Sequence, residues 1–137
     1  MRGRLRATFA ALTLVAAMGS IGVAAASPAT AATCTLDWQT HGGVAGFYAG
    51  YYNGNTINTK QGQRNSRVTE VQCVLIIWAD LNDDPRLSPH GADGIFGGNT
   101  ETAVENAQRY YLFPGQPNQW DGEVGPATWP RLRRMAP

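Results

Sequence analysis

The feature that most restricts the fold of this chain is an internal repeat of eight residues. Residues 93–100 read DGIFGGNT and residues 121–128 read DGEVGPAT, so that five positions correspond in identity or apolar character at a constant offset of 28. Asp-Gly favours a tight turn, because aspartate bonds the backbone that follows it and glycine accepts positive φ. Each copy precedes an expected helix start, where backbone N–H groups lack partners. The repeat therefore predicts two turn-plus-helix units in one domain.

Apolar periodicity predicts three helices. From Ser66, apolar residues recur at spacings of three and four, with Asn65 or Ser66 as the N-cap, until the Asn- and Pro-rich segment 80–89 ends the helix. A second helix is expected over about 99–111, and a short third one opens at Pro126, since proline is favoured in the first helical turn. Residues expected in the core include Val68, Val71, Leu75, Ala103, Val104, Ala107, Leu132 and the tryptophans Trp38, Trp78 and Trp129.

The first 32 residues have the pattern of a secretory signal peptide. Three arginines precede an uncharged apolar run, and small residues follow this run up to Ala32. A retained membrane anchor is the alternative, since about 20 apolar residues can span a bilayer. The run is rich in alanine and glycine rather than leucine, however, and this favours cleavage. We therefore expect a secreted, extracellular protein that has no membrane contact once the leader is removed.

Removal of residues 1–32 leaves 8 basic and 10 acidic residues, a balance that argues against nucleic acid as a partner. Residues 33–61 are rich in glycine and aromatics and are expected to form an irregular arm, in which Asn53-Gly54 is a turn signal and a short hairpin is an open alternative. Cys34 and Cys73 are the two cysteines, and in an exported protein such a pair predicts a disulfide, with two free thiols as the alternative. This bridge would tether the arm to the first helix.

In combination, these motifs resemble the peptidoglycan-binding domain of the three-helix type, which typically carries D-G-x-F-G-x-x-T-x-x-A-V-x-x-F-Q followed by D-G-x-V-G-x-x-T-W. The resemblance covers residues 62 to about 132, with longer loops at 80–92 and 112–120 than the family norm. It implies a mainly α fold: a small three-helix peptidoglycan-binding-like bundle over residues 62–137, preceded by the irregular, disulfide-tethered N-terminal arm. The matching residues are Gly62, Asn65 (where the family has glycine), Val68, Val71, Gln72, Leu75, Asp93, Gly94, Phe96, Gly97, Thr100, Ala103, Val104, Ala107, Gln108, Asp121, Gly122, Val124, Gly125, Thr128 and Trp129.

The resemblance also implies a non-enzymatic binding module for peptidoglycan, through its glycan and its stem peptide, with no cofactor and no metal. A helix start preceded by glycines can receive a stem-peptide carboxylate, while amide and aromatic side chains can bond or stack against the rest of the ligand. For the turn residues, a role in folding alone is the alternative. A monomer is the default expectation. The candidate ligand-binding residues are Asp93, Gly94, Phe96, Gly97, Asn99, Gln108, Tyr110 and Trp120.

Two other functions are open. A minimal cell-wall hydrolase would need two suitably placed carboxylates, and the Asp-rich segment 80–93 offers several without selecting a pair. His41 and His90 are the only histidines, and their surroundings do not have the spacing of a zinc site. An accessory or regulatory module that binds another secreted protein is the second alternative, because a fold does not fix a function.

Overall fold

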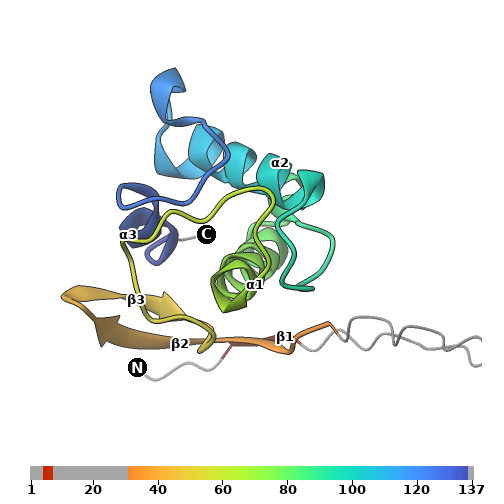
Figure 1. The fold of residues 1–137 in the computed structure, drawn as a ribbon, viewed down its shortest axis with the longest axis vertical. Coiled ribbons are helices and arrows are strands. Elements are labelled where there is room, and N and C mark those ends of the chain that lie inside the picture. Colours follow the sequence, from red (N-terminus) through yellow and green to blue (C-terminus); the bar gives the residue numbers. More distant parts are fainter. Residues whose placement is uncertain (1–4, 8–30, 136–137) are drawn as a thin grey trace, which may run out of the picture.

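The computed structural model describes residues 5–7 and 31–135, and helix α1 (Ser66–Leu81) lies at the centre of the described chain. The side chain of Asn65 caps its start by accepting a hydrogen bond from the backbone N–H of Val68 at 3.2 Å. Residues Val68 and 70–78 are all buried, because other elements cover α1 on several sides. Figure 1 shows α1 between the strands on one side and α2 on the other.

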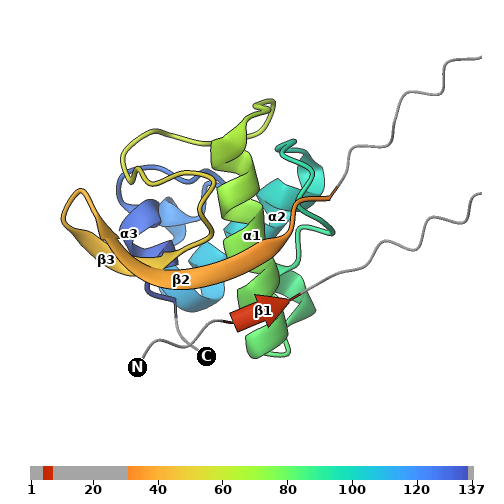
Figure 2. The ribbon, with the colours of Figure 1, turned by 90° about the horizontal axis from the view of Figure 1, so that it is seen from below.

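The expectation of a mainly α three-helix bundle with an irregular arm is wrong. Strands β2 (Cys34–His41) and β3 (Val44–Tyr48) form a regular antiparallel hairpin that packs beside α1 (Figures 1 and 2). The hairpin turns at Gly42-Gly43, whose φ values of 55° and 78° suit the two-residue turn that fits the twist of paired strands. Asn53-Gly54, the turn signal seen in the sequence, lies outside the hairpin. The fold is therefore a mixed one, with a two-stranded hairpin and about three helices.

A short strand β1 (Leu5–Ala7) pairs antiparallel with the start of β2, from Leu5 opposite Leu36 to Ala7 opposite Cys34. Most of the expected signal peptide, residues 1–32, lies outside the described residues, and its removal stays a prediction. Within the described part of the chain, no helix is both long and apolar enough to cross a membrane.

The second and third helices are found close to their expected positions but are shorter. Helix α2 spans Gly98–Ala107 and continues into a π-helical turn, η2 (Gln108–Leu112). Helix α3 spans Thr128–Leu132 and begins two residues after Pro126. The loops between helices contain two short 3-10 turns, η1 (Pro85–Leu87) and η3 (Pro117–Gln119).

The core contains nearly all of the residues that the apolar pattern selected, and one tryptophan is an exception. Trp78 and Trp129 are buried, as predicted, whereas Trp38 is 57% exposed. Trp38 sits on β2 opposite Phe47 and contacts it edge-to-face, with ring centroids 5.0 Å apart. Phe47 in turn packs on Trp78, so that Trp38 is the outermost ring of this row. The predicted disulfide is confirmed: Cys34 and Cys73 join the start of β2 to α1.

A fully buried ion pair holds the N-terminal segment onto the helices. Arg133, just after α3, donates to the carboxylate of Glu70 on α1, and both side chains are 0% exposed. The same carboxylate accepts hydrogen bonds from the backbone N–H groups of Ala49, Tyr51 and Tyr52, at 2.8, 2.9 and 3.2 Å. The Arg133 guanidinium also donates to further groups of the arm and stacks on two rings: the oxygens of Phe47, Tyr52, Gly54 and Asn55, and the rings of Tyr48 and Trp129.

Candidate functional site

The first copy of the repeated turn is held by a buried glutamine of α1. Gln72 is 1% exposed, and its side-chain nitrogen lies 3.0 Å from Asp93 Oδ1, from the Ile95 carbonyl and from Thr100 Oγ1. Its side-chain oxygen accepts the N–H of Gly94 at 2.9 Å, where the chain turns with φ 74°. All the polar atoms of this side chain are thus used to fix the turn before α2.

The second copy has the same arrangement around Gln108, which is 0% exposed. The Gln108 nitrogen donates to Asp121 Oδ1, the Glu123 carbonyl and Thr128 Oγ1, at 2.9, 2.8 and 3.4 Å. Its oxygen accepts the N–H of Gly122 at 2.9 Å. The internal repeat is therefore a repeated hydrogen-bonding unit. In each copy, a helix glutamine forms hydrogen bonds to the Asp-Gly turn and to the threonine that follows it.

Replacing either glutamine by leucine is expected to lower the free energy of unfolding by about 2–3 kcal/mol, because a buried N–H and several buried acceptors lose their partner. Gln72→Leu and Gln108→Leu should cost similar amounts, since their partners correspond one to one. The exposed residue Gln61 provides a control, and Gln61→Leu should stay within about 0.5 kcal/mol. Urea unfolding followed by circular dichroism measures all three, and equal stabilities would contradict the assignment.

A groove of about 150 Å³ lies where the sequence placed the ligand site, between the first turn and the start of α2. It brings together the predicted residues Asp93, Gly97 and Asn99. The first turn of α2 borders the groove, and its N-cap Gly97 provides no side-chain hydrogen bond. The groove can therefore offer backbone N–H donors, a carboxylate and an amide to a polar ligand.

Six further groove residues were not among the predicted site residues, and Pro89 and His90 are the two of them that lie outside the repeated motif and α1. His90 is exposed and has φ 62°, a left-handed conformation that non-glycine residues seldom adopt. His90 also lines a neighbouring hollow of about 300 Å³, together with Ala32, Cys34 and Ile76. The one available sequence signal is its place before Gly91 in a Pro-rich loop, and this signal does not distinguish a groove residue from an ordinary turn.

The other predicted site residues lie elsewhere. Gly94, Phe96 and Gln108 are buried, so the contacts that the structure gives them belong to the fold. Tyr110 is 45% exposed and lies under the Arg86 guanidinium, 3.9 Å from the ring centroid. Trp120 is half-buried, donates its indole N–H to the Phe113 carbonyl at 2.9 Å and packs against Arg109. The groove therefore contains three of the eight predicted residues, Asp93, Gly97 and Asn99.

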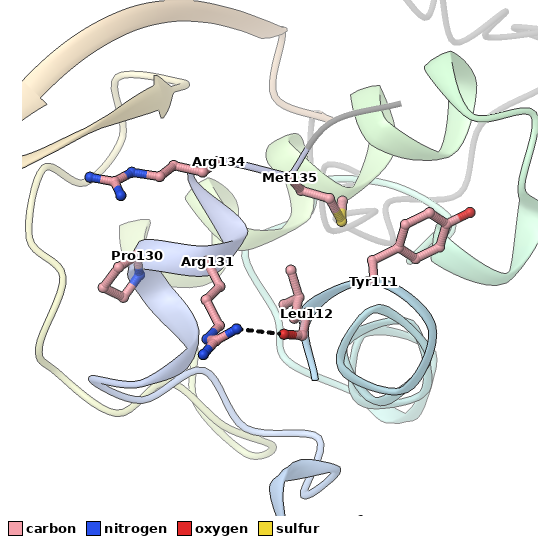
Figure 3. Close-up of a pocket in the computed structure, with 6 residues that line it drawn as sticks. All are labelled: Tyr111, Leu112, Pro130, Arg131, Arg134 and Met135. Carbon is pink, nitrogen blue, oxygen red and sulfur yellow. Dashed lines mark hydrogen bonds between the residues drawn. The ribbon is translucent and has the colours of Figure 1, made fainter. Parts of the chain in front are cut away.

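A larger pocket, of about 510 Å³, lies between η2 and α3 (Figure 3). Leu112 and Met135, both buried, provide its apolar surface, and Pro130 lines one side. Arg131 donates to the Leu112 carbonyl at 3.0 Å, the contact that is drawn dashed in Figure 3. Tyr111 and Arg134 complete the lining. Nothing in the sequence pattern marked these residues as a group.

Tyr111 connects this pocket to a buried carboxylate. Asp84, 6% exposed, accepts the Tyr111 hydroxyl at 2.7 Å and binds Arg86 through both of its oxygens, at 2.9 and 2.8 Å. The hydrogen bonds from Arg86 hold the pKa of Asp84 well below its usual range, although burial acts in the opposite direction. The same bond to Asp84, together with burial, raises the pKa of Tyr111. At neutral pH the carboxylate is therefore charged and the phenol is protonated.

This cluster predicts a contribution to acid stability. Because the folded-state pKa of Asp84 is lowered, its contribution is complete above the unfolded-state pKa of about 4 and is lost as the pH falls below that value. Asp84→Asn should therefore flatten the fall in stability between pH 5 and pH 2. Urea midpoints at several pH values measure the slope, with the exposed Asp83→Asn as control. An unchanged slope in Asp84→Asn would contradict the prediction.

No group of three or more His, Cys, Asp and Glu side chains in residues 5–7 and 31–135 is arranged to hold a metal ion.

The comparisons with known proteins identify the fold. No family model matches the chain, and no curated protein matches it. Among solved structures, the chain is similar to the crystal structure of a peptidoglycan-binding protein from Clostridioides difficile in complex with glutamine hydroxamate. The two share 22% sequence identity with a TM-score of 0.55, over 84% of this chain and 67% of the other. The chain therefore has a peptidoglycan-binding-like fold.

Proposed function

We propose that this protein is a secreted, non-catalytic module that binds cell-wall peptidoglycan. The observation that carries the proposal is the groove beside Asp93 and Asn99, which lies at the repeated turn whose sequence resembles that of peptidoglycan-binding domains. The fold likeness supports the same function, since the similar structure is that of a protein named for peptidoglycan binding. The wall-associated location follows from the expected leader peptide together with this ligand.

The groove suits the polar parts of peptidoglycan. Amide groups of a stem peptide can bond to Asn99 and to the free oxygen of Asp93, while an acceptor group can bond to the N–H groups at the start of α2. Because Gln72 and the N–H of Ile95 already bind Asp93 Oδ1, the carboxylate is fixed in orientation before a ligand arrives. A preorganised donor and acceptor set loses less entropy on binding.

The lowered pKa of Asp84 and the burial of Glu70 fit a non-catalytic role better than hydrolysis. Hydrolysis by a carboxylate pair needs one acid with a raised pKa. Asp84, the buried aspartate of the Asp-rich segment, has its pKa lowered by Arg86. Glu70 is fully buried in its pair with Arg133 and so cannot reach a polymer. Neither of these two carboxylates is therefore suited to act as that acid.

Incubation of the protein with purified insoluble peptidoglycan tests the proposal. We expect the protein to sediment with the wall and to release no soluble fragments. Asn99→Ala should weaken sedimentation by up to about tenfold, since it removes a hydrogen-bonding amide from the groove. Asn118→Ala is the matched control, because Asn118 is exposed on η3 and outside the groove. Release of fragments would favour a hydrolase, and a protein that stays in solution would favour a protein partner.

A further inference from the structure

Trp38 on β2 is the most exposed large apolar side chain in the part of the chain that the structure describes. Its exposed fraction is 57%, compared with 36–48% for the next four, Tyr51, Ile57, Leu81 and Tyr110. The resemblance to peptidoglycan-binding domains begins at residue 62, so it assigns no role to the hairpin that carries this ring. Single exposed apolar residues are common on proteins, and the surroundings of Trp38 therefore decide whether the ring forms a site.

Two further rings support the indole of Trp38. Phe47, directly opposite on β3, contacts it with ring centroids 5.0 Å apart and ring planes at 84°. Phe47 also contacts the buried Trp78 of α1, at a centroid distance of 5.5 Å. Because the planes of Trp38 and Phe47 are nearly perpendicular, Phe47 does not stack flat on the indole. The ring is thus held in place and keeps surface for a flat ligand, whose binding then costs little side-chain entropy.

Polar groups lie on the same hairpin. Thr40 is exposed and shares its face of β2 with Trp38, since alternate residues of a strand point to the same side. Ala45 is opposite Thr40, and its carbonyl accepts Nε of the exposed Arg134 at 2.9 Å. A guanidinium carries five N–H donors, so the Nη groups of Arg134 can donate to a ligand. The hairpin therefore offers a ring together with a hydroxyl and cationic donors.

The size of this surface fits a sugar better than a protein partner. An aromatic side chain buries about 150–250 Å², whereas a stable protein–protein interface buries about 1,200–2,000 Å². A pyranose ring has a face of C–H groups and a rim of hydroxyl groups. The C–H face can stack on the negative face of an indole, and the hydroxyl groups can bond to side chains such as those of Thr40 and Arg134.

We propose that the hairpin surface around Trp38 binds the glycan strand of peptidoglycan, with one sugar ring stacked on the indole. The inference rests on the proposed function and adds a second contact to it, since the groove at the start of α2 is assigned to the stem peptide. Figure 1 shows α1 between the hairpin and α2, so the two contacts lie on different sides of the domain. Two contacts with one insoluble polymer strengthen retention on the wall without either being tight alone.

Titration with chitotetraose, a soluble oligosaccharide of linked N-acetylglucosamine units that carries no peptide, tests the glycan contact. We expect the amide NMR signals of residues 36–47 to shift and those of residues 93–100 to stay in place. Tryptophan fluorescence should move to shorter wavelength, because the sugar displaces water from the exposed indole while Trp78 and Trp129 are already buried.

Variants of the ring give the matched comparison. Trp38→Ala should weaken chitotetraose binding by about tenfold or more, as removal of a stacking ring does elsewhere. Trp38→Phe retains an aromatic face and should keep part of the affinity. Tyr110→Ala is the control, since it removes an exposed ring of η2, outside the hairpin, and its titration should match that of the unchanged protein. Thermal unfolding checks that each variant is folded.

The outcomes separate this inference from the proposed function. Absence of chitotetraose binding, signal shifts confined to residues 93–100, or a folded Trp38→Ala variant that binds like the unchanged protein would overturn the glycan contact, even where the protein still sediments with walls. The position of the signal shifts is measured on the unchanged protein, so it decides the question even if Trp38→Ala does not fold. Failure of the unchanged protein to sediment with intact walls counts against the proposed function itself.

Discussion

Replacing Arg133 by methionine is expected to lower the free energy of unfolding by about 3–5 kcal/mol, the cost of leaving a buried charge without its partner. The lost partner is the Glu70 carboxylate, and both side chains are wholly buried. Glu70 would keep its bonds to the backbone of 49–52 but would have no neutralising cation. Since small domains are stable by about 5–15 kcal/mol, such a loss removes much of the total.

Urea unfolding monitored by tryptophan fluorescence measures this effect. Arg134→Met, one residue further on and exposed, is the matched control and should cost less than about 1 kcal/mol. The double variant Glu70→Leu/Arg133→Met should be more stable than the sum of the single changes implies, because no charge is then left unpaired in the core. A loss below about 1 kcal/mol in Arg133→Met would contradict the role assigned to the pair.

Removal of the Cys34–Cys73 bridge is the second large effect, with an expected loss of about 4 kcal/mol from chain entropy across a separation of 39 residues. The bridge restricts the unfolded chain, and in the folded state it fixes the start of β2 to α1. Loss of the bridge should therefore expose the hairpin to local opening as well as lower the global stability.

Comparison of urea midpoints with and without dithiothreitol gives this value directly, and Cys34→Ala/Cys73→Ala gives it without a reductant. Hydrogen exchange of the hairpin amides should increase more than exchange in the middle of α1. The cysteine-free variant treated with dithiothreitol is the control, and its midpoint should not change. Equal midpoints for the oxidised and reduced protein would contradict a stabilising role for the bridge.

The helical half of the fold was predictable because its signals are local. The sequence offered Asn65 or Ser66 as the cap of the first helix, and the structure has Asn65. The repeated Asp-Gly turns lie before α2 and α3, as their chemistry required. Gln72 was visible only as a match to a motif, and Gln108 was placed among the ligand-binding candidates. Their role in holding the turns became clear through contacts across 13 to 28 residues.

The strands were expected only as an open alternative to an irregular arm, because the signal in residues 33–61 is ambiguous. Glycine every few residues argues against a helix without specifying a strand, and Asn53-Gly54 is a stronger turn signal in isolation than Gly42-Gly43. Trp38 was assigned to the core by residue type, but β2 continues beyond the surface that Phe47 and Trp78 cover. Register and burial of a hairpin depend on the partner surface, and a single sequence does not contain that information.

The buried ion pair could not be predicted from the sequence for a related reason. Glu70 and Arg133 are 63 residues apart. Two other arginines lie within two positions of Arg133, and they donate instead to backbone carbonyls: Arg131 to that of Leu112 and Arg134 to that of Ala45. No local pattern distinguishes the buried arginine of this run from its exposed neighbours. At the groove, by contrast, the sequence selected Asp93, Gly97 and Asn99 because they lie in or beside the repeated turn, and their role in binding stays a prediction.

The most direct test of wall recognition is a depletion isotherm of the leader-free protein against increasing amounts of purified, insoluble peptidoglycan. We expect saturable depletion from solution, competition by soluble muropeptides and no release of wall fragments over the incubation. A protein that stays in the supernatant at every wall concentration, or one that solubilises the wall while it binds, would contradict the proposal that this fold holds peptidoglycan without cleaving it.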